Sequence, residues 1–531
     1  MSEPVWLGLP EGQTVAAALQ QGRLDAAADG LEALLGRFPD DAALLYNFAV
    51  IACDLGRLGP AAAAYRRLAG AAPAFRARAV SGLLRAAQLS GSFAAIEAAT
   101  SDAASFLDRG IEAIDDLPIL KYFAYRRVFI PAFDPLGPRL ERRIAQLLGA
   151  ERRPLLQRPK RPARLTIGYL SSGFGDHPIG HVTSGLFAAH DRTRFRVLGF
   201  SGRDRRDEPA PYAGIIRAGF DAVDEIGLLP PAVAAARIAA AGVDILVSLD
   251  QHMDWRGRTS SPEILALRPA PLQLAWLGVA AGTGLPSVDY LLADTVTVPP
   301  DEAASLVERV WHLPDCYHCA SPHPIAPGGP SRAECGLPET GIVFAGFNNI
   351  EKIDRGAFAA WMAILRGVSG SVLWLTNQRR FAVTEANLRQ EAERLGVAGA
   401  RLVFAHRLPD KALHLARHAQ ADLLLDTFTI NASTTALDAL WAGLPVVTKR
   451  GSRFPARLAE TFLRSLGLEE LVASDPERFI RLAIDLALDP PRLAALKARL
   501  RAAVAAGPLF DIAGFAAKLE TAFDQLWAAA P

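Results

Sequence analysis

The strongest constraint in the sequence is an alternation of short apolar segments with helical segments that begins at Arg164. Helical segments such as PPAVAAARIAAAG and GAFAAWMAILRGV lie between the apolar ones. Strands separated by helices can pair in parallel, so the pattern predicts doubly wound α/β sheets. The segments typical of buried strands are RLTIGYL, FRVLGF, VDILVSL, IVFAGF, SVLWL, RLVF and ADLLL.

This alternation occurs in two series, at about 164–320 and 340–510, separated by the Pro- and Gly-rich stretch PHPIAPGGPS at 322–331. We therefore expect two Rossmann-like domains, 164–325 and 335–531, the second ending in a terminal helix. Ligands of such folds bind at the carboxyl ends of the strands, and two facing sheets form a cleft there. No GxGxxG motif follows the first strand, which argues against a dinucleotide oxidoreductase.

The N-terminal third carries a repeat with a period of 34 residues. The tripeptide GRL at 22–24 recurs at 56–58, Pro39 recurs as Pro73, and another glycine follows at Gly91. Alanine-rich helical patterns lie between these positions, as in the tetratricopeptide repeat. The alternative is an alanine-rich helical domain whose spacing is coincidental.

The repeat pattern predicts an all-α, tetratricopeptide-like region over 1–105. A helical connector and a basic, Pro-containing linker are expected over 106–163. Repeats of this kind stack into a curved surface that binds partners, so we expect a protein acceptor to dock there.

The composition argues against several classes of protein. Lys and Arg number 57 and Asp and Glu 56, so no basic excess indicates binding to nucleic acid or an acidic membrane. Four cysteines do not make a disulfide scaffold, and Cys316 and Cys319 lack a second CxxC, so no metal site is expected. No secretory signal or membrane span is evident, and we expect a cytoplasmic protein.

One candidate site follows the first strand of the α/β region, in the segment FGDHPIGH at 174–181. Its glycines allow a ligand to approach the backbone, and His177 and His181 can exchange protons near neutral pH. A turn with surface histidines is the alternative interpretation.

The second series carries basic side chains after its strands. The segment FNNIEKID contains Asn349 and Lys352, whose cation could neutralise a phosphate, although a solvated lysine at a helix start is commoner. Lys411, His414 and Arg417 recur every three positions, so on a helix they share one face.

A hydroxyl-rich helix start follows at NASTT. Ser433, Thr434 and Thr435 offer hydroxyls and free backbone N–H groups to an anion. The alternative is an ordinary N-cap with Asp438 in the first turn. Together with the basic residues, the segment predicts a pocket for a nucleotide diphosphate.

At these residues the sequence resembles the O-linked N-acetylglucosamine transferase family, which includes the SPINDLY-type protein O-fucosyltransferases. The similarity runs in order over about 164–530, after repeats in the family's usual position. Besides the Lys411, His414 and Arg417 series, the matching segments are RLTIGYLSSGFGDHPIGH, ALRPAPLQLAWLGVAAGTGLPSVDYLLAD, FNNIEKID, SVLWL and LDTFTINASTTALDALWAGLPVVT.

The resemblance implies a GT-B glycosyltransferase with two Rossmann-like domains, an inverting mechanism, no metal or other cofactor, and a nucleotide sugar held mainly by the C-terminal domain. In that family the lysine and threonines contact the diphosphate and the aspartate contacts the ribose. The corresponding nucleotide-sugar positions are Asn349, Lys352, His414, Arg417, Ser433, Thr434, Thr435 and Asp438.

The resemblance also implies roles for the remaining candidates. His177, the first histidine of the HPxxH motif, and Lys411 are the expected catalytic residues, with His177 a candidate base beside the sugar and acceptor. His181 and His252 are expected on the acceptor and sugar side.

The expected function is transfer of N-acetylglucosamine from UDP to Ser or Thr of a protein. Ser433 stands where the animal enzymes have a histidine, and GTGLPSVDY and LPDCYHC are closer to the SPINDLY branch. One alternative is therefore fucose transfer from GDP-fucose. Another is transfer of a different activated sugar, such as an acidic one, to a bacterial surface protein such as flagellin, which would suit the short repeat array. A non-catalytic repeat scaffold is the third.

Overall fold

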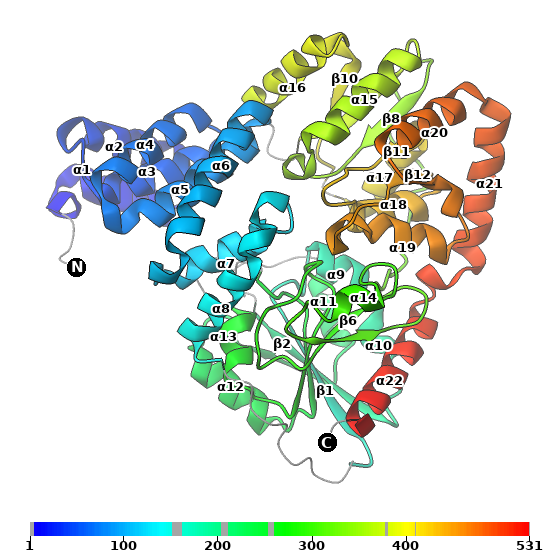
Figure 1. The fold of residues 1–531 in the computed structure, drawn as a ribbon, viewed down its shortest axis with the longest axis horizontal. Helices are drawn as coiled ribbons and strands as arrows, with labels where there is room; N and C mark the ends of the chain where they lie inside the picture. The colour runs from blue at the N-terminus through cyan, green and yellow to red at the C-terminus, as the bar shows by residue number, and fades with distance from the viewer. Residues whose placement is uncertain are drawn as a thin grey trace.

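The computed structural model describes residues 5–150, 162–202, 211–252, 260–377, 381–408 and 410–529. It consists of an N-terminal helical region and two α/β domains, each built on a parallel sheet. Figure 1 shows the helical region on the left, the sheet with β1 below and the sheet with β8 above. Within these ranges, no helix combines the length and apolarity needed to cross a bilayer.

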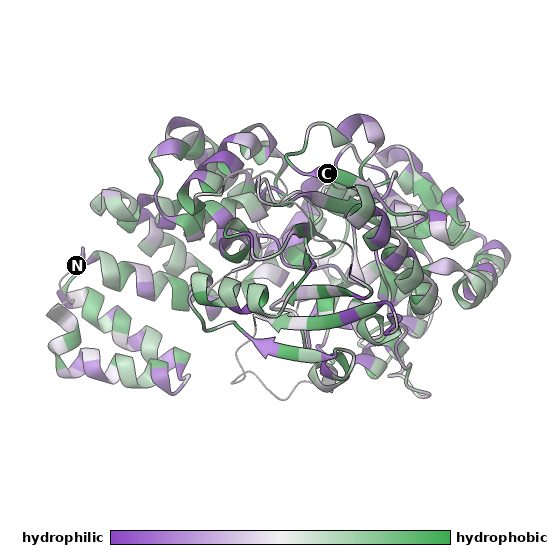
Figure 2. Cartoon of the chain, turned by 90° about the horizontal axis from the view of Figure 1, so that it is seen from below, coloured by the Kyte–Doolittle hydropathy of each residue, from purple (hydrophilic) through white to green (hydrophobic). Residues whose placement is uncertain are grey.

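The helical region begins with helices that pack in successive pairs, each carrying both hydrophobic and hydrophilic residues (Figure 2). A glycine with positive φ forms the turn inside each pair: Gly22 at 70°, Gly56 at 78° and Gly91 at 66°. Glycine lacks a Cβ and adopts this conformation without steric cost. The helices are α1 (Pro10–Gln20), α2 (Leu24–Arg37), α3 (Ala42–Asp54), α4 (Leu58–Ala71), α5 (Arg76–Ser90) and α6 (Phe93–Gly110).

Gly82 allows close packing between α4 and α5. A Cβ at this position would lie 2.2 Å from the ring of Tyr65. We therefore expect Gly82→Ala to lower the free energy of unfolding by about 1–3 kcal/mol through overpacking, despite alanine's higher helix propensity. Gly36→Ala in α2, where a Cβ meets nothing within 4 Å, should instead be neutral or stabilising by up to about 1 kcal/mol. Urea unfolding of both variants compares the two, and equal effects would contradict the packing argument.

The connector that follows is part of a shared core. It contains α7 (Leu117–Arg126), the 3-10 helix η4 (Pro131–Leu136) and α8 (Gly137–Leu148). Phe123 of α7 and Ile144 of α8 belong to the same hydrophobic cluster as Ile238 and Ile264 of the first α/β domain. The helical region is thus packed onto the first α/β domain. The linker expected at 152–164 lies mostly outside the described residues.

The first α/β domain has, within the described residues, a seven-stranded parallel sheet in the order β3-β2-β1-β4-β5-β6-β7. Its strands are β1 (Leu165–Ser171), β2 (Phe195–Ser201), β3 (Ala222–Glu225), β4 (Ile245–Ser248), β5 (Leu272–Ala275), β6 (Tyr290–Ala293) and β7 (Arg309–His312). Its helices are α9 (Pro178–Thr183), α10 (Leu186–Ala189), α11 (Pro211–Ala218), α12 (Pro231–Ala240), α13 (Ser261–Ala266) and α14 (Pro300–Ala303).

The second domain has, within the described residues, a six-stranded parallel sheet in the order β10-β9-β8-β11-β12-β13. Its strands are β8 (Val343–Gly346), β9 (Val372–Thr376), β10 (Leu402–Ala405), β11 (Leu423–Leu425), β12 (Val446–Lys449) and β13 (Val472–Ala473). Its helices are α15 (Arg355–Gly367), α16 (Ala382–Arg394), α17 (Lys411–Ala416), α18 (Thr434–Trp441), α19 (Leu458–Ser465), α20 (Pro476–Leu488) and α21 (Pro490–Ala506).

The two parallel sheets confirm the predicted fold class, and every apolar segment named from the sequence contains a strand. The strands that the pattern missed are short or partly polar. β3 reads AVDE and β7 reads RVWH, and both lie at sheet edges where neither face is fully buried. Edge strands carry a weaker hydrophobic signal, because only part of their surface is removed from water.

The terminal helix α22 (Ile512–Ala529) packs on the first α/β domain rather than on the second, which precedes it in the chain (Figure 1). Glu520 of α22 accepts a hydrogen bond from the backbone N–H of Asp191 at 2.7 Å and lies 3.0 Å from Nδ1 of His190. The range 335–531 expected for one domain therefore ends in a helix that joins it to the other.

Candidate active site

The candidate residues lie at the positions where the strand order of each sheet reverses. In the first sheet this switch point lies between β1 and β4, which are followed by His177 and His252. In the second sheet it lies between β8 and β11, which are followed by Lys352 and Ser433. Ligands of open parallel sheets bind in the crevice at such points, so the topology brings both sets of residues to one cleft.

A carboxylate and two basic side chains converge in the second domain. Lys411 Nζ lies 2.6 and 2.5 Å from the two carboxylate oxygens of Asp438, and His414 Nε2 lies 3.5 Å from one of them. Burial would raise the pKa of Asp438, but the hydrogen bond with His414 and the charge of Lys411 hold it far below its usual range. Burial also lowers the pKa of His414. The site thus combines a fixed carboxylate with a fixed cation.

Arg417 does not join this cluster. The α-helix ends at Ala416, and the Arg417 guanidinium turns inward, 4.6 Å from the ring of Phe347, and donates to the carbonyl of His406 at 2.9 Å. Burial lowers the pKa of Arg417 to about 10. Lys411 and His414 therefore share a face toward Asp438, whereas the side chain of Arg417, at the start of a 3-10 turn, points onto Phe347.

Lys352 lies at the end of the 3-10 helix η6 (Ile350–Lys352), which Asn349 caps. Its ammonium donates to the carbonyl of Asn431 at 3.3 Å, and burial lowers the pKa of Lys352 to about 8. Asn349 is exposed, and its side chain accepts from the N–H of Glu351 at 3.5 Å. A half-buried cation that faces a backbone carbonyl is well placed to exchange this weak partner for an anion.

The first turn of α18 remains open. Ser433 stands at the N-cap position but makes no capping hydrogen bond to the described residues, and its hydroxyl lies 3.1 Å from Nε2 of His318 in the other domain. The interpretation of Ser433 as an ordinary N-cap is therefore wrong. His318 donates its Nδ1 hydrogen to the carbonyl of Cys319 at 2.7 Å. The Nε2 atom of the neutral ring can therefore accept a hydrogen bond from the Ser433 hydroxyl. The free N–H groups of α18 can then receive an anion beside Thr434.

The first domain contributes histidines with different surroundings. His177 caps α9, with its Nδ1 accepting from the N–H of Ile179 at 3.2 Å. His181 lies 2.8 Å from Asp176, and burial and the charge of Lys411 lower the pKa of His181. The last effect shows that His181 lies near the lysine of the opposite domain.

His252 is enclosed. Its Nε2 donates to the carbonyl of Thr283 at 2.6 Å, and burial lowers its pKa to about 4. Its Nδ1 has no hydrogen-bond partner among the described residues. This nitrogen is therefore an unused acceptor at the carboxyl end of β4, consistent with a place for a ligand hydroxyl or a water molecule.

A cavity of about 690 Å³ opens between the domains. Asp176 and Tyr212 line it from the first domain, and Asp410 and Lys411 line it from the second. A narrower recess next to it is lined by residues that include His181, Thr434 and Asp438. The volume falls in the range of pockets for ligands of nucleotide-sugar size.

Sequence reasoning assigned no role to several residues that hold the site together, although Asp426 lies in the candidate segment LDT at 425–427. Asp426 is buried after β11 and accepts from the N–H of Ala432 and the hydroxyl of Thr448, both at 2.7 Å. His318 and Glu351 were missed as well. Asp426 was detectable as an acid directly after an apolar strand, whereas the partners of His318 and Glu351 lie over 100 residues away in the chain.

Two facing α/β domains, with a terminal helix that returns to the first and an anion site at the switch point of the second, define a glycosyltransferase of the GT-B fold. The family model for glycosyl transferase family 41 matches residues 152–327 and 328–519. The chain belongs to this family, which confirms the resemblance seen in the sequence.

Relatives support the same assignment. The chain is 31% identical over 381 residues to the Arabidopsis thaliana protein SEC, and 31% identical over 384 residues to A. thaliana SPINDLY; both are named as probable UDP-N-acetylglucosamine–peptide N-acetylglucosaminyltransferases. These matches cover 68% and 70% of this chain but only 37% and 40% of the relatives. The structure of a mutant of the Thermobaculum terrenum O-GlcNAc transferase matches with a TM-score of 0.82 at 27% identity, covering 98% of this chain and 99% of that one.

Proposed function

We propose that this chain is a protein O-glycosyltransferase that transfers N-acetylglucosamine from its UDP donor to serine or threonine hydroxyls of a protein. The names of the relatives support this activity. The observation that carries the proposal is the convergence of Lys411 and His414 on Asp438, next to the uncapped start of α18. This arrangement suits a nucleotide diphosphate: N–H groups and cations for the phosphates, and a carboxylate for the ribose.

The proposed reaction inverts the anomeric centre. The acceptor oxygen attacks the anomeric carbon from the face opposite the diphosphate, the bond from this carbon to the phosphate oxygen breaks, and the diphosphate leaves with the electron pair. Lys352, Lys411 and the N–H groups of α18 stabilise the charge that develops on the leaving group. These fixed positive groups can stabilise the leaving diphosphate, a role that a divalent metal has in other transferases.

His177 acts in this proposal as a hydrogen-bond donor. Its Nδ1 accepts from the N–H of Ile179, so the neutral ring carries its hydrogen on Nε2. Taking up a second proton would break the bond to Ile179. We therefore assign His177 to orienting the sugar or the acceptor, and the hydroxyl proton passes to the departing diphosphate or to water. His177→Ala should then abolish most transfer while nucleotide binding is retained.

The acceptor protein is proposed to dock on the helical region. A cavity of about 460 Å³ lies between helices α4, α5 and α6 and helix α16 of the second domain. Small residues, among them Gly59, Ala62 and Ala95, leave room along it. An extended segment placed there would lie against both the repeats and the domain that is proposed to hold the donor.

Calorimetry of the purified chain with UDP, GDP and CMP, in the presence of a metal chelator, tests the proposal. We expect selective binding of UDP, and at least 10-fold weaker binding by Lys411→Met. A preference for GDP would instead favour fucose transfer, and a preference for CMP would favour an acidic sugar. Binding of none of the three would contradict a transferase and favour a repeat scaffold.

A further inference from the structure

A buried ion pair joins the helical region to the loop that carries Lys352. Arg126, the last residue of α7, places Nη1 2.5 Å from the carboxylate of Glu351 in η6. The two side chains are only 9% and 12% exposed. The guanidinium also lies 5.1 Å from the ring centre of Tyr122 and 5.3 Å from that of Phe129. Two charges largely removed from water in this way stabilise each other, and removing one of them costs the other its charged neighbour.

The loop between β8 and α15 is held from two sides. On the side of its own domain, the Asn348 amide donates to Thr427 at 3.2 Å, and Asp354 accepts from the N–H groups of Phe428 and Thr429. On the other side, Glu351 reaches across to α7. These contacts fix both ends and the centre of a segment too short to fold by itself.

Lys352 is the residue that this arrangement orients. It follows Glu351 directly and ends the three-residue helix η6, so a change in the backbone at Glu351 moves the base of the Lys352 side chain. Within the described residues its ammonium donates to the carbonyl of Asn431 at 3.3 Å, which is a weak restraint. The position of the cation therefore depends on its backbone, and the backbone depends on Arg126.

We propose that Arg126 is a positioning residue for the donor site: its ion pair with Glu351 holds Lys352 in place, so the helical region forms part of the machinery that binds the donor. This inference rests on the proposed function insofar as Lys352 contacts the diphosphate. Its structural half, that Arg126 orders the segment 348–354, can be tested without any ligand.

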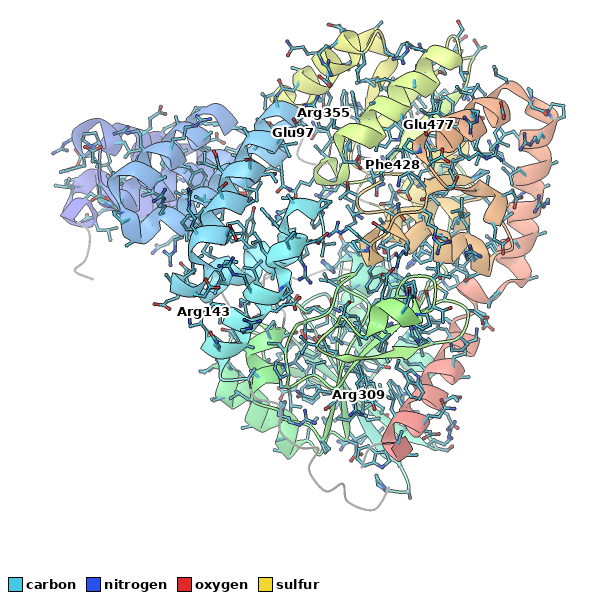
Figure 3. The ribbon with its side chains drawn as sticks, viewed as in Figure 1. Glu97, Arg143, Arg309, Arg355, Phe428 and Glu477 are labelled. Carbon is cyan, nitrogen blue, oxygen red and sulfur yellow. The ribbon has the colours of Figure 1, made fainter. Side chains whose placement is uncertain are left out.

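Other contacts between the same two parts of the molecule provide a matched control. Arg355 of α15 pairs with Glu97 of α6 at 2.6 Å, but these side chains are 41% and 60% exposed. Figure 3 labels both residues next to each other, where the helical region meets the second α/β domain. Glu97 lies on the helical region and contacts α15 rather than the loop. Exposed pairs contribute little to stability, so Glu97→Gln removes a contact of the same kind without disturbing Lys352.

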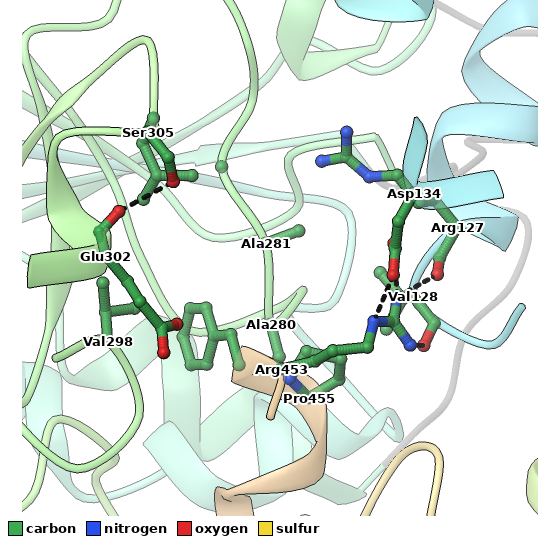
Figure 4. A pocket seen from close by; sticks show the side chains of 13 residues that line it. Arg127, Val128, Asp134, Ala280, Ala281, Val298, Glu302, Ser305, Arg453 and Pro455 are labelled. Carbon is green, nitrogen blue, oxygen red and sulfur yellow. Dashed lines mark hydrogen bonds and ion pairs between the residues drawn. The ribbon is translucent and has the colours of Figure 1, made fainter. Parts of the chain in front are cut away.

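Arg453 provides a further attachment away from the loop. It pairs with Asp134 and donates to the carbonyl of Val128, so the second domain also holds the part of the connector that directly follows α7 (Figure 4). These groups line a cavity of about 190 Å³ where the helical region meets both α/β domains. Loss of the Arg126 pair is therefore expected to loosen the loop without detaching the connector.

The test uses the full chain with Arg126→Met, Glu351→Gln, the charge swap Arg126→Glu with Glu351→Arg, and the control Glu97→Gln. Hydrogen exchange is measured by mass spectrometry for 348–354 and, as an internal reference, for β9 and β10. Binding of UDP, GDP, CMP and inorganic pyrophosphate is measured by calorimetry. We expect exchange in 348–354 to accelerate at least 10-fold in the first two variants and the dissociation constant of the bound probe to rise about 10-fold. Glu97→Gln should change neither the exchange rate of 348–354 nor the dissociation constant by more than 2-fold. The charge swap should partly restore both quantities.

Unchanged exchange in 348–354 and unchanged affinity in a folded Glu351→Gln variant would overturn the proposal, as would equal effects in Glu97→Gln. If Arg126→Met does not fold, Glu351→Gln decides, because glutamine keeps the shape of glutamate and removes only its charge. If the unaltered chain binds none of the probes, the proposed function fails, and the exchange measurement alone decides the positioning role.

Discussion

Replacing Lys411 by methionine is expected to lower the rate constant of sugar transfer by about 10²–10³-fold, the effect typical of removing one group that stabilises charge in the transition state. Both carboxylate oxygens of Asp438 in α18 hold the ammonium of Lys411 in a fixed position. The charge on a leaving diphosphate grows as its bond to the sugar breaks. The loss should therefore appear mainly in kcat, measured by steady-state transfer at saturating donor.

The same substitution should reduce stability for a separable reason. Without Lys411, the mostly buried carboxylate of Asp438 loses the cation that holds it and keeps His414 at 3.5 Å, whose pKa burial lowers. An ion that loses its buried partner destabilises a fold by about 3–5 kcal/mol. The double variant Lys411→Met with Asp438→Asn should recover most of this loss in urea unfolding without recovering transfer. A Lys411→Met variant that keeps more than a third of the normal kcat would contradict the proposed role of Lys411 in stabilising the leaving diphosphate.

Lys352 is expected to make donor binding depend on pH in the alkaline range. Burial lowers its pKa to about 8, so the side chain is charged below this pH and increasingly neutral above it. A diphosphate binds the charged form better, so the dissociation constant of the donor nucleotide should rise as the pH increases from 7 to 9.5. Calorimetry at half-unit steps of pH measures the midpoint.

The stability of the chain should change in the opposite direction with pH. Lys352 has a lower pKa in the folded chain than its ordinary value of 10.5, so between about 8 and 10.5 the unfolded chain binds more protons. The contribution of this group therefore makes the free energy of unfolding increase with pH in that window. This contribution of Lys352 is smallest below about pH 8, where the lysine is charged in both the folded and the unfolded chain.

Two variants isolate the Lys352 effect. Lys352→Arg keeps a charge that does not titrate below about pH 12. The affinity of this variant for the donor nucleotide should therefore not fall near pH 8. Lys352→Met should bind donor weakly at every pH and transfer sugar at least 10²-fold more slowly. A decline near pH 8 that persists in Lys352→Arg would assign the titration to another group.

Much of the architecture was predictable from local patterns. In a doubly wound fold, helices cover both faces of each parallel sheet, so its inner strands must be apolar along their whole length. The apolar runs in the sequence correspond to β1, β2, β4, β8, β9, β10 and β11. The period of 34 residues was readable because Gly22 and Gly56 both occupy turns with positive φ. These signals lie within a few residues, so no tertiary information is needed to detect them.

The position of the candidate residues at strand ends was also predictable, because residues that follow parallel strands lie at one edge of a sheet. His177, Lys352 and Thr434 all follow strands at the switch points of their sheets. The direction of individual side chains was not predictable. Arg417 turns onto Phe347 instead of toward Asp438, and a spacing of three residues does not show this.

By itself the sequence determined the fold class, the repeats and the list of residues at the strand ends, since each depends on local periodicity and on where strands stop. Only the tertiary structure decided which partners those residues have. Ser433 forms a hydrogen bond with His318 of the other domain instead of capping its own helix. Glu351 pairs with Arg126, which lies 225 positions earlier in the chain. Such pairs are set by how two domains and a helical region pack together, and packing of distant surfaces leaves no periodic mark in a single chain.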